Sequence, residues 1–318
     1  MHPSLTYISE KFSMTKSTLL VSIILLAATL NSFAADSHHD RDFWRAIAKA
    51  HYAVPEHESA DALSHELSTM LASPDPELRD EIAYSILAHW IYRPNVLSTP
   101  TLLSLTDEWR ANLHTGLGEV GTNSVLLRSF SALCLSAMAN REAKSPFMSA
   151  DRYHALLAEA TNYLTAERDL RGYDPQLHWI HSTAHTADLL SALADSAQLT
   201  KEEAATILHA IDTRLATAPQ VYTQGEQDRL AAAVVSVIRR RDFDTSTIDS
   251  SALDSWLAHL ESEDRDVWTA TTPESLAHFQ NHNYLLQALT VRILLEPDSP
   301  QMTTYRQKVL KLMSSRTD

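Results

Sequence analysis

Histidine and aspartate are unusually dense in DPQLHWIHSTAHTADLL, the segment from Asp174 to Leu190. Both side chains bind metal ions and exchange protons near neutral pH, so this segment is a candidate metal or acid–base site. On one helix over residues 174–196, at about 100° per residue, the polar side chains fall within an arc of roughly 80°. We therefore expect a single polar stripe formed by Asp174, His178, His181, His185 and Asp188.

The stripe has three interpretations. It is the solvated face of a helix, a metal site, or a metal-free site for acid–base chemistry or anion binding. In the metal interpretation His181 and His185, four residues apart, bind one divalent ion with Asp188 as the third ligand. However, HSTAH lacks the glutamate of the zinc-protease motif HExxH. No cofactor is therefore predicted, and a divalent metal at these three residues is the minority interpretation.

The rest of the chain predicts an all-α fold. It has only 5 glycines among 318 residues and no Asn-Gly or Asp-Gly pair, so the tight turns of a large sheet are missing. Prolines follow capping residues at several predicted helix starts, such as Asp75-Pro76, Asp174-Pro175 and Thr272-Pro273. Apolar residues recur at helical spacing over about twelve segments. These are residues 41–53, 59–73, 76–92, 99–115, 121–140, 150–166, 174–196, 200–217, 224–241, 250–262, 273–295 and 300–314.

Short connections between these helices imply antiparallel neighbours, and a row of such pairs must stack to bury each apolar stripe. We expect stacked helical hairpins, as in an α-solenoid of the HEAT or armadillo kind or a curved helical array. The sequence shows no regular repeat, so a closed α/α toroid and an irregular bundle remain alternatives. Residues 35–98 are expected as N-terminal helices and 99–318 as the helical-repeat domain, and the two can form one continuous array.

The first residues resemble a signal peptide. Lys16 precedes an apolar run from Leu19 to Leu30, and the small residues Ser32 and Ala34 suit a cleavage site. We expect residues 1–34 to be removed and the mature protein to be exported, periplasmic or secreted, without a membrane segment. The net charge of −14, with no lysine- or arginine-rich block, argues against nucleic acid as a partner.

Four motifs carry a resemblance to a known family. They are RSFSAL from Arg128, DLRGY from Asp169, WIHSTAHTADLL from Trp179 and YTQGEQDRL from Tyr222. In this order and spacing they resemble the bacterial family catalogued as domain of unknown function 2785, over roughly residues 100 to 295. The resemblance implies a helical architecture and a set of positions, but no reaction. Its pattern has glycine in the place of His178, which argues against a shared three-histidine metal site.

On this sequence the family pattern falls on Arg128, Asp169, Arg171, Gly172, Trp179, His181, His185, Asp188, Gly225, Glu226 and Arg229. Among these, Arg128, the pair His181 and His185, and the pair Glu226 and Arg229 come from three predicted helices. The helices lie about 45 to 55 residues apart, which is the period of successive hairpins in a stacked array. We therefore expect these side chains to converge in one groove. Their mixed charges suit an ion-pair network or a small polar or anionic ligand better than a metal cage.

The sequence thus favours a groove that binds a small polar ligand or a protein partner. A hydrolase or lyase in which His181, His185 and Asp188 serve as acid–base groups or metal ligands is the alternative, so enzyme activity stays undecided. A purely structural cluster is the third interpretation. In that case Asp169 and Arg171 would only brace the turn at 167–174, after Gly172 ends the preceding helix in a left-handed conformation.

Overall fold

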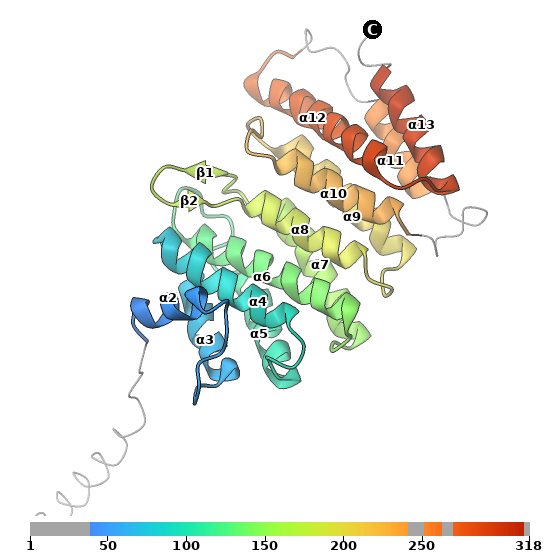
Figure 1. Ribbon diagram of the computed structural model, residues 1–318. Helices are drawn as coiled ribbons and strands as arrows, with labels where there is room; N and C mark the ends of the chain where they lie inside the picture. Colours follow the sequence, from blue (N-terminus) through green and yellow to red (C-terminus); the bar gives the residue numbers. More distant parts are fainter. Residues whose placement is uncertain (1–38, 241–250, 263–269, 315–318) are drawn as a thin grey trace, which may run out of the picture. The chain divides into compact units, whose positions relative to one another are not determined.

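The computed structural model describes residues 39–240, 251–262 and 270–314, and Figure 1 shows that they are almost entirely helical. The prediction of an all-α fold with about twelve helices is confirmed for these residues. The elements are α2 (Arg41–Lys49), α3 (Ala60–Met70), η1 (Glu77–Tyr84), α4 (Ser85–Tyr92), α5 (Thr99–Asn112), α6 (Ser124–Lys144), α7 (Ala150–Ala166), β1 (Tyr173–Asp174), β2 (His178–Trp179), α8 (Ser182–Ala194), α9 (Lys201–Thr217), α10 (Glu226–Ile238), α11 (Ser251–Ser262), α12 (Pro273–Leu295) and α13 (Pro300–Ser314).

Capping side chains begin many of these helices where the sequence predicts them. Thr200 accepts a hydrogen bond from the backbone N–H of Glu203, whose carboxylate accepts the N–H of Thr200 in return. Thr272 caps α12 directly before Pro273. The predicted ranges 150–166, 273–295 and 300–314 match α7, α12 and α13. The predicted helix 76–92 begins instead as the π-helix η1 and continues as α4.

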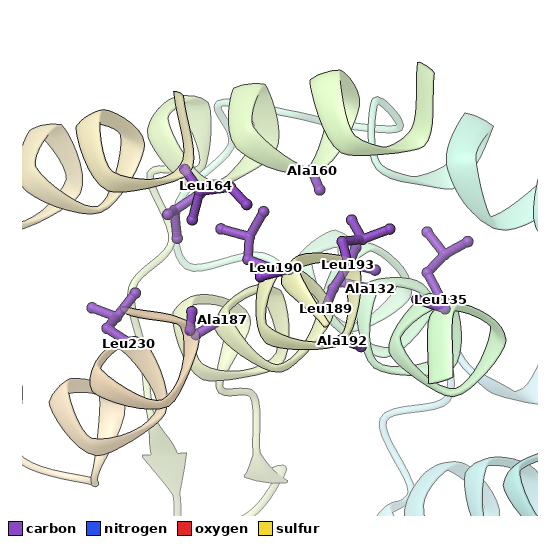
Figure 2. Close-up of a cluster of buried hydrophobic side chains, with 14 of the residues drawn as sticks. Ala132, Leu135, Ala160, Leu164, Ala187, Leu189, Leu190, Ala192, Leu193 and Leu230 are labelled. Carbon is purple, nitrogen blue, oxygen red and sulfur yellow. The ribbon is translucent and has the colours of Figure 1, made fainter. Parts of the chain in front are cut away.

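The helices pack in two rows. Helices α4, α6, α8, α10 and α12 lie side by side, each against the next, and α8 contacts α6 and α10 most extensively (Figure 1). The second row packs against the first and consists of helices α3, α5, α7, α9, α11 and α13. The apolar core fills the space between the rows. Figure 2 shows Leu164 of α7 above Leu190 of α8, with Leu230 of α10 and Leu135 of α6 farther along the same core on either side.

Residues Arg41–Asp318 form one compact unit. The predicted signal peptide, residues 1–34, lies outside the described residues. None of the described helices is long and apolar enough to cross a membrane.

Asp212 of α9 links α9 to two other helices. Its Oδ1 lies 3.3 Å from Nε2 of His282 in α12, and its Oδ2 lies 3.2 Å from Nε2 of His259 in α11. Nδ1 of His282 faces the carbonyl of His278 at 2.9 Å, so both ring nitrogens of this buried histidine face oxygen acceptors. Burial raises the pKa of Asp212, but the hydrogen bond and charges of the histidines outweigh it and hold the pKa below its usual value.

Asp212→Asn tests this link. Because the folded-state pKa of Asp212 is lowered, its charge stabilises the fold above about pH 4, the value of an unfolded aspartate, and this stabilisation is lost as the pH falls through the folded-state value. We expect the variant to lose about 1 to 2 kcal/mol at pH 6, after allowance for partial solvent screening. Urea unfolding from pH 7 to pH 2 measures the difference, which should shrink in acid.

Asp42→Asn is the control, because Asp42 is exposed and lies 3.2 Å from Arg45 within one helix. Its unfolding free energy should change by less than about 0.5 kcal/mol. A loss for Asp212→Asn that stays constant down to pH 2 would contradict the electrostatic link.

Candidate functional site

The polar segment does not form one helix, contrary to the prediction for residues 174–196. Strands β1 and β2 form a short antiparallel hairpin, and α8 begins only at Ser182. Oδ1 of Asp174 accepts hydrogen bonds from the backbone N–H groups of Gln176 at 2.8 Å and Leu177 at 2.9 Å. An aspartate before proline caps a helix or closes a turn by the same kind of bond, and here it closes the turn of the hairpin. The predicted single stripe is therefore wrong.

Two histidines have left-handed backbone conformations where the hairpin meets α8. His178 has φ 58° and His181, the N-cap of α8, has φ 51°. Glycine adopts this conformation without strain, so the backbone at His178 accommodates the glycine that the resemblance implies at this place. The turn at His181 still brings its ring to His185, at a centroid distance of 5.9 Å. The structure thus pairs these two histidines although only His185 lies within the helix.

Arg79 of η1 holds the hairpin in place. Its Nη2 donates to the carbonyl of Leu177 at 2.6 Å and to that of Trp179 at 3.3 Å, and its Nη1 donates to the carbonyl of Ser73 at 3.0 Å. The guanidinium is fully buried and lies 4.7 Å from the centre of the Phe130 ring. Arg79 belongs to none of the predicted motifs, yet it fixes the backbone that carries Trp179.

Arg128 lies in the interior and not in an open groove. Its Nε and Nη2 donate to the carboxylate of Glu167 at 2.6 and 3.1 Å, and its Nη1 contacts the carbonyls of Thr115 and Gly116 and the hydroxyl of Ser124, each at 2.9 Å. Arg128 and Glu167 are both buried. Each of the three guanidinium nitrogens donates to a protein group and the side chain is fully buried, so Arg128 is not accessible to a ligand from solvent.

Asp169 and Arg171 brace two loops. The carboxylate of Asp169 accepts from Nε of Arg171 at 2.8 Å, from Nη2 at 2.7 Å, and from the backbone N–H of Gly121 at 2.9 Å. Nη2 of Arg171 also donates to the carbonyl of Thr122 at 2.8 Å. The pair thus links the loop after α7 to the loop before α6. This agrees with the interpretation in which Asp169 and Arg171 have a bracing role.

Gly172 does not end a helix, because α7 ends at Ala166 and Gly172 has no left-handed φ. This corrects the expectation for Gly172. A Cβ atom at this position would lie 2.3 Å from Oε1 of Gln224 and 2.8 Å from Oε1 of Glu226. A side chain at this position would therefore displace the ends of the Gln224 and Glu226 side chains, which pack against the glycine from the start of α10.

His181 is anchored to the turn before α10. Its Nε2 lies 3.0 Å from the carbonyl of Gln224 and 3.6 Å from Oε1 of the buried Glu226. Burial lowers the pKa of His181 below its usual value and outweighs the opposite effect of Glu226. A neutral ring that donates its Nε2–H to Gln224 has a lone pair on Nδ1. His181 therefore has one acceptor to offer.

His185 is held in the same neutral state. Ser129 donates its hydroxyl hydrogen to the carbonyl of Ile180, so its Oγ accepts Nδ1–H of His185 at 2.8 Å. Burial, with the charge of Arg229, lowers the pKa of His185 to about 3. The lone pair therefore resides on Nε2, for which no described residue serves as a hydrogen-bond partner.

Arg229 of α10 is only partly engaged. Its Nη1 contacts both carboxylate oxygens of Asp188 at 2.9 and 2.7 Å, whereas Nε and Nη2 make no hydrogen bond with a described residue. Its side chain is 49% exposed. Burial raises the pKa of Asp188, although Arg229 opposes this effect. We call His181, His185, Asp188 and Arg229 the His–Arg site.

The site continues into a pocket and an exposed aromatic group. A cavity of about 270 Å³ runs from Asp188 along α8, and its polar lining consists of Tyr84, Tyr92, Ser136, Asn140, Asp188, Ser191 and Asp195. At the other end Trp179 is 42% exposed and stacks on His181 with a centroid distance of 4.5 Å. Among the described residues no three His, Cys, Asp or Glu side chains converge to hold a metal ion.

The two arginines allow a direct test. Arg128→Ala leaves Glu167 buried without its cation, so we expect a loss of about 3 to 5 kcal/mol in the free energy of unfolding. Arg229→Ala removes a half-exposed pair and should cost less than about 1 kcal/mol. Chemical denaturation of both variants measures the losses. Large losses for both would show that Arg229 is a structural arginine too.

Comparison with models of known protein families matches residues 113–291 to a family described as "Protein of unknown function (DUF2785)". The match includes all four motifs and every residue of the His–Arg site. No curated protein and no solved structure matches the chain. More than half of the sequence is matched, so the chain belongs to the DUF2785 family.

Proposed function

We propose that this protein binds a small anionic ligand at the His–Arg site. The observation that carries the proposal is the state of Arg229, which uses one nitrogen for Asp188 and leaves two without a partner among the described residues. A guanidinium fixed from one side presents its remaining N–H groups in a fixed geometry, which suits a carboxylate or phosphate.

Other arginines of the fold support this reading by contrast. Arg128 has all its nitrogens occupied, and Arg239 uses Nε and Nη2 for the two oxygens of Glu296. Arg292 contacts Asp228 in the same paired way. Arg229 is about as exposed as Arg239 but engages its carboxylate through Nη1 alone. A purely structural ion pair would gain from the second nitrogen, so the open side favours a ligand.

The histidines favour binding over acid–base catalysis. A general base works best when its pKa lies near the working pH, and His185, with a pKa of about 3, is far from that range. His181, also lowered, is bound to Gln224 through Nε2. A hydrolase or lyase that uses His181, His185 or Asp188 for proton transfer is therefore the less favoured alternative.

Calorimetric titration with phosphate, succinate and citrate tests the proposal. We expect binding that weakens with salt and a drop in affinity of at least about tenfold for Arg229→Gln, because the charged donor is lost. Arg45→Gln is the matched control, since Arg45 is similarly exposed but pairs with Glu77 through Nε and Nη2. Equal affinities of the two variants, or no binding to any of these anions, would contradict the proposal.

We also propose that the two rows form an open α-solenoid. Each helix of the row from α4 to α12 contacts the next, as in repeat proteins whose hairpins touch only their neighbours. In such an array the His–Arg site lies on the successive helices α8 and α10, and His185 contacts Ser129 of the preceding helix α6. A solved structure in which α13 returns to contact α2 would show a closed ring instead.

We further propose that residues 1–34 direct export and are cleaved, which leaves Ala35 as the first residue. The support is the sequence pattern of Lys16, the apolar run and the small residues before Ala35. Expression of the full chain in a Gram-negative host, followed by mass spectrometry of the periplasmic fraction, should show a mature N-terminus at Ala35. Ala34→Trp should block cleavage, and an uncleaved cytoplasmic chain in both cases would refute export.

A further inference from the structure

The His–Arg site offers acceptors as well as a cation. Nδ1 of His181 and Nε2 of His185 carry lone pairs, because the other nitrogen of each ring donates to the protein. A bare carboxylate brings only acceptors and leaves these lone pairs without a donor. The ligand that satisfies this site must therefore carry O–H or N–H donors beside its anionic group.

Exposed aromatic rings stand next to these acceptors. Tyr173, His178 and Trp179, here called the aromatic platform, belong to the β1–β2 hairpin. Tyr173 lies 5.0 Å from Trp179 in an edge contact and stacks on His178 at 5.8 Å. Tyr173 is 46% exposed. An apolar platform in solvent suits a ligand with an apolar ring face.

The platform is rigid, since Arg79 binds the carbonyls of Leu177 and Trp179. Of the tryptophans in the described residues, Trp44, Trp90, Trp109 and Trp256 are buried and only Trp179 is exposed. A fixed, exposed indole loses little conformational entropy when a ligand covers it. This arrangement is typical of a binding surface. It is unfavourable for folding alone, because the indole remains exposed to water.

The pocket beyond Arg229 is lined by further groups that bind hydroxyls. Tyr84, Tyr92, Asn140 and Asp195 contribute phenol, amide and carboxylate groups to a cavity of about 270 Å³, near the lower end of small-molecule sites. From His181 to Asp195 the helix advances by about 20 Å at about 1.5 Å per residue. That length exceeds a single sugar ring and accommodates a short chain of them.

We propose, resting on the anion-binding function above, that the ligand is an acidic oligosaccharide. One ring packs its C–H face on Trp179, a carboxylate binds Nε and Nη2 of Arg229, and hydroxyl groups donate to His181, His185 and the pocket. This ligand class meets the three requirements together: an apolar ring face, an anionic group and many O–H donors. A flat aromatic acid lacks the donors, and a neutral sugar lacks the charge.

Titration of the whole protein with galacturonate oligomers of one to four units tests the ligand class, with tryptophan fluorescence and calorimetry as readouts. We expect affinity to rise with length and to exceed that of neutral maltotetraose by at least tenfold. Arg229→Gln should remove this preference for the acidic sugar. Trp179→Ala should weaken binding at least tenfold, whereas Tyr284→Ala, an exposed aromatic residue of α12 outside the site, should not.

Thermal unfolding midpoints of the variants establish that each one folds. The class is overturned if Trp179→Ala binds as tightly as the wild type, if maltotetraose matches the acidic oligomer, or if benzoate or tetraglutamate binds more tightly. If succinate or phosphate binds through Arg229 but the oligomers bind no better, the saccharide is wrong and the anion site stands. If no anion binds at all, both proposals fail.

Discussion

The buried guanidinium of Arg79 fixes the geometry on which the candidate site depends. Its hydrogen bonds to the carbonyls of Leu177 and Trp179 hold the β1–β2 hairpin against η1. The held hairpin sets the point at which α8 begins, so His181 lies in the left-handed turn before the helix and His185 lies one turn later. Together with the bonds of His181 to Gln224 and of His185 to Ser129, this anchor fixes the two rings relative to each other and to Trp179.

The charged residues of the motifs fall into two kinds, which differ in how many of their polar atoms bind protein partners. Arg128, Glu167, Asp169 and Arg171 bind protein partners and tie loops and helices together. Arg229 is the most exposed of the predicted site arginines and binds its carboxylate through Nη1 alone. The motifs therefore contain both bracing residues and the residues of the proposed ligand site, and their hydrogen-bond partners distinguish them where residue types do not.

Much of the helical framework is predictable because its signals are local. Caps such as Thr272 and the apolar periodicity locate α7, α12 and α13 within the sequence. The hairpin is not predictable in this way, since Asp174 before proline signals a turn and a helix start equally well. The burial of Arg79 could be predicted from the sequence. It lies three residues before the buried Ile82 and seven before the buried Ile86, and this helical spacing places it on the same face.

The convergence of distant residues was predictable only in part. The spacing of successive helical hairpins along the sequence predicts that the residues of α8 and α10 lie close together. In the structure His181 lies beside Glu226, and Asp188 lies beside Arg229. It could not reveal that Arg128 turns inward, because its partner Glu167 carries no motif and lies 39 residues away. Which side of a helix is covered depends on the packing of neighbouring helices, and that information is not local.

The central claim is that His185 is a neutral acceptor beside an open arginine. Long-range ¹H–¹⁵N NMR of histidine side chains from pH 8 to pH 3 tests it directly, with His185→Gln for assignment. We predict that His185 stays neutral down to about pH 4, one unit above its pKa of about 3, with the proton on Nδ1 and a bare Nε2, and that the Nε2 signal shifts when a bound ligand donates to it. An imidazolium at His185 by pH 6, or an Nε2 signal that does not shift when a ligand with O–H donors binds, would contradict the account.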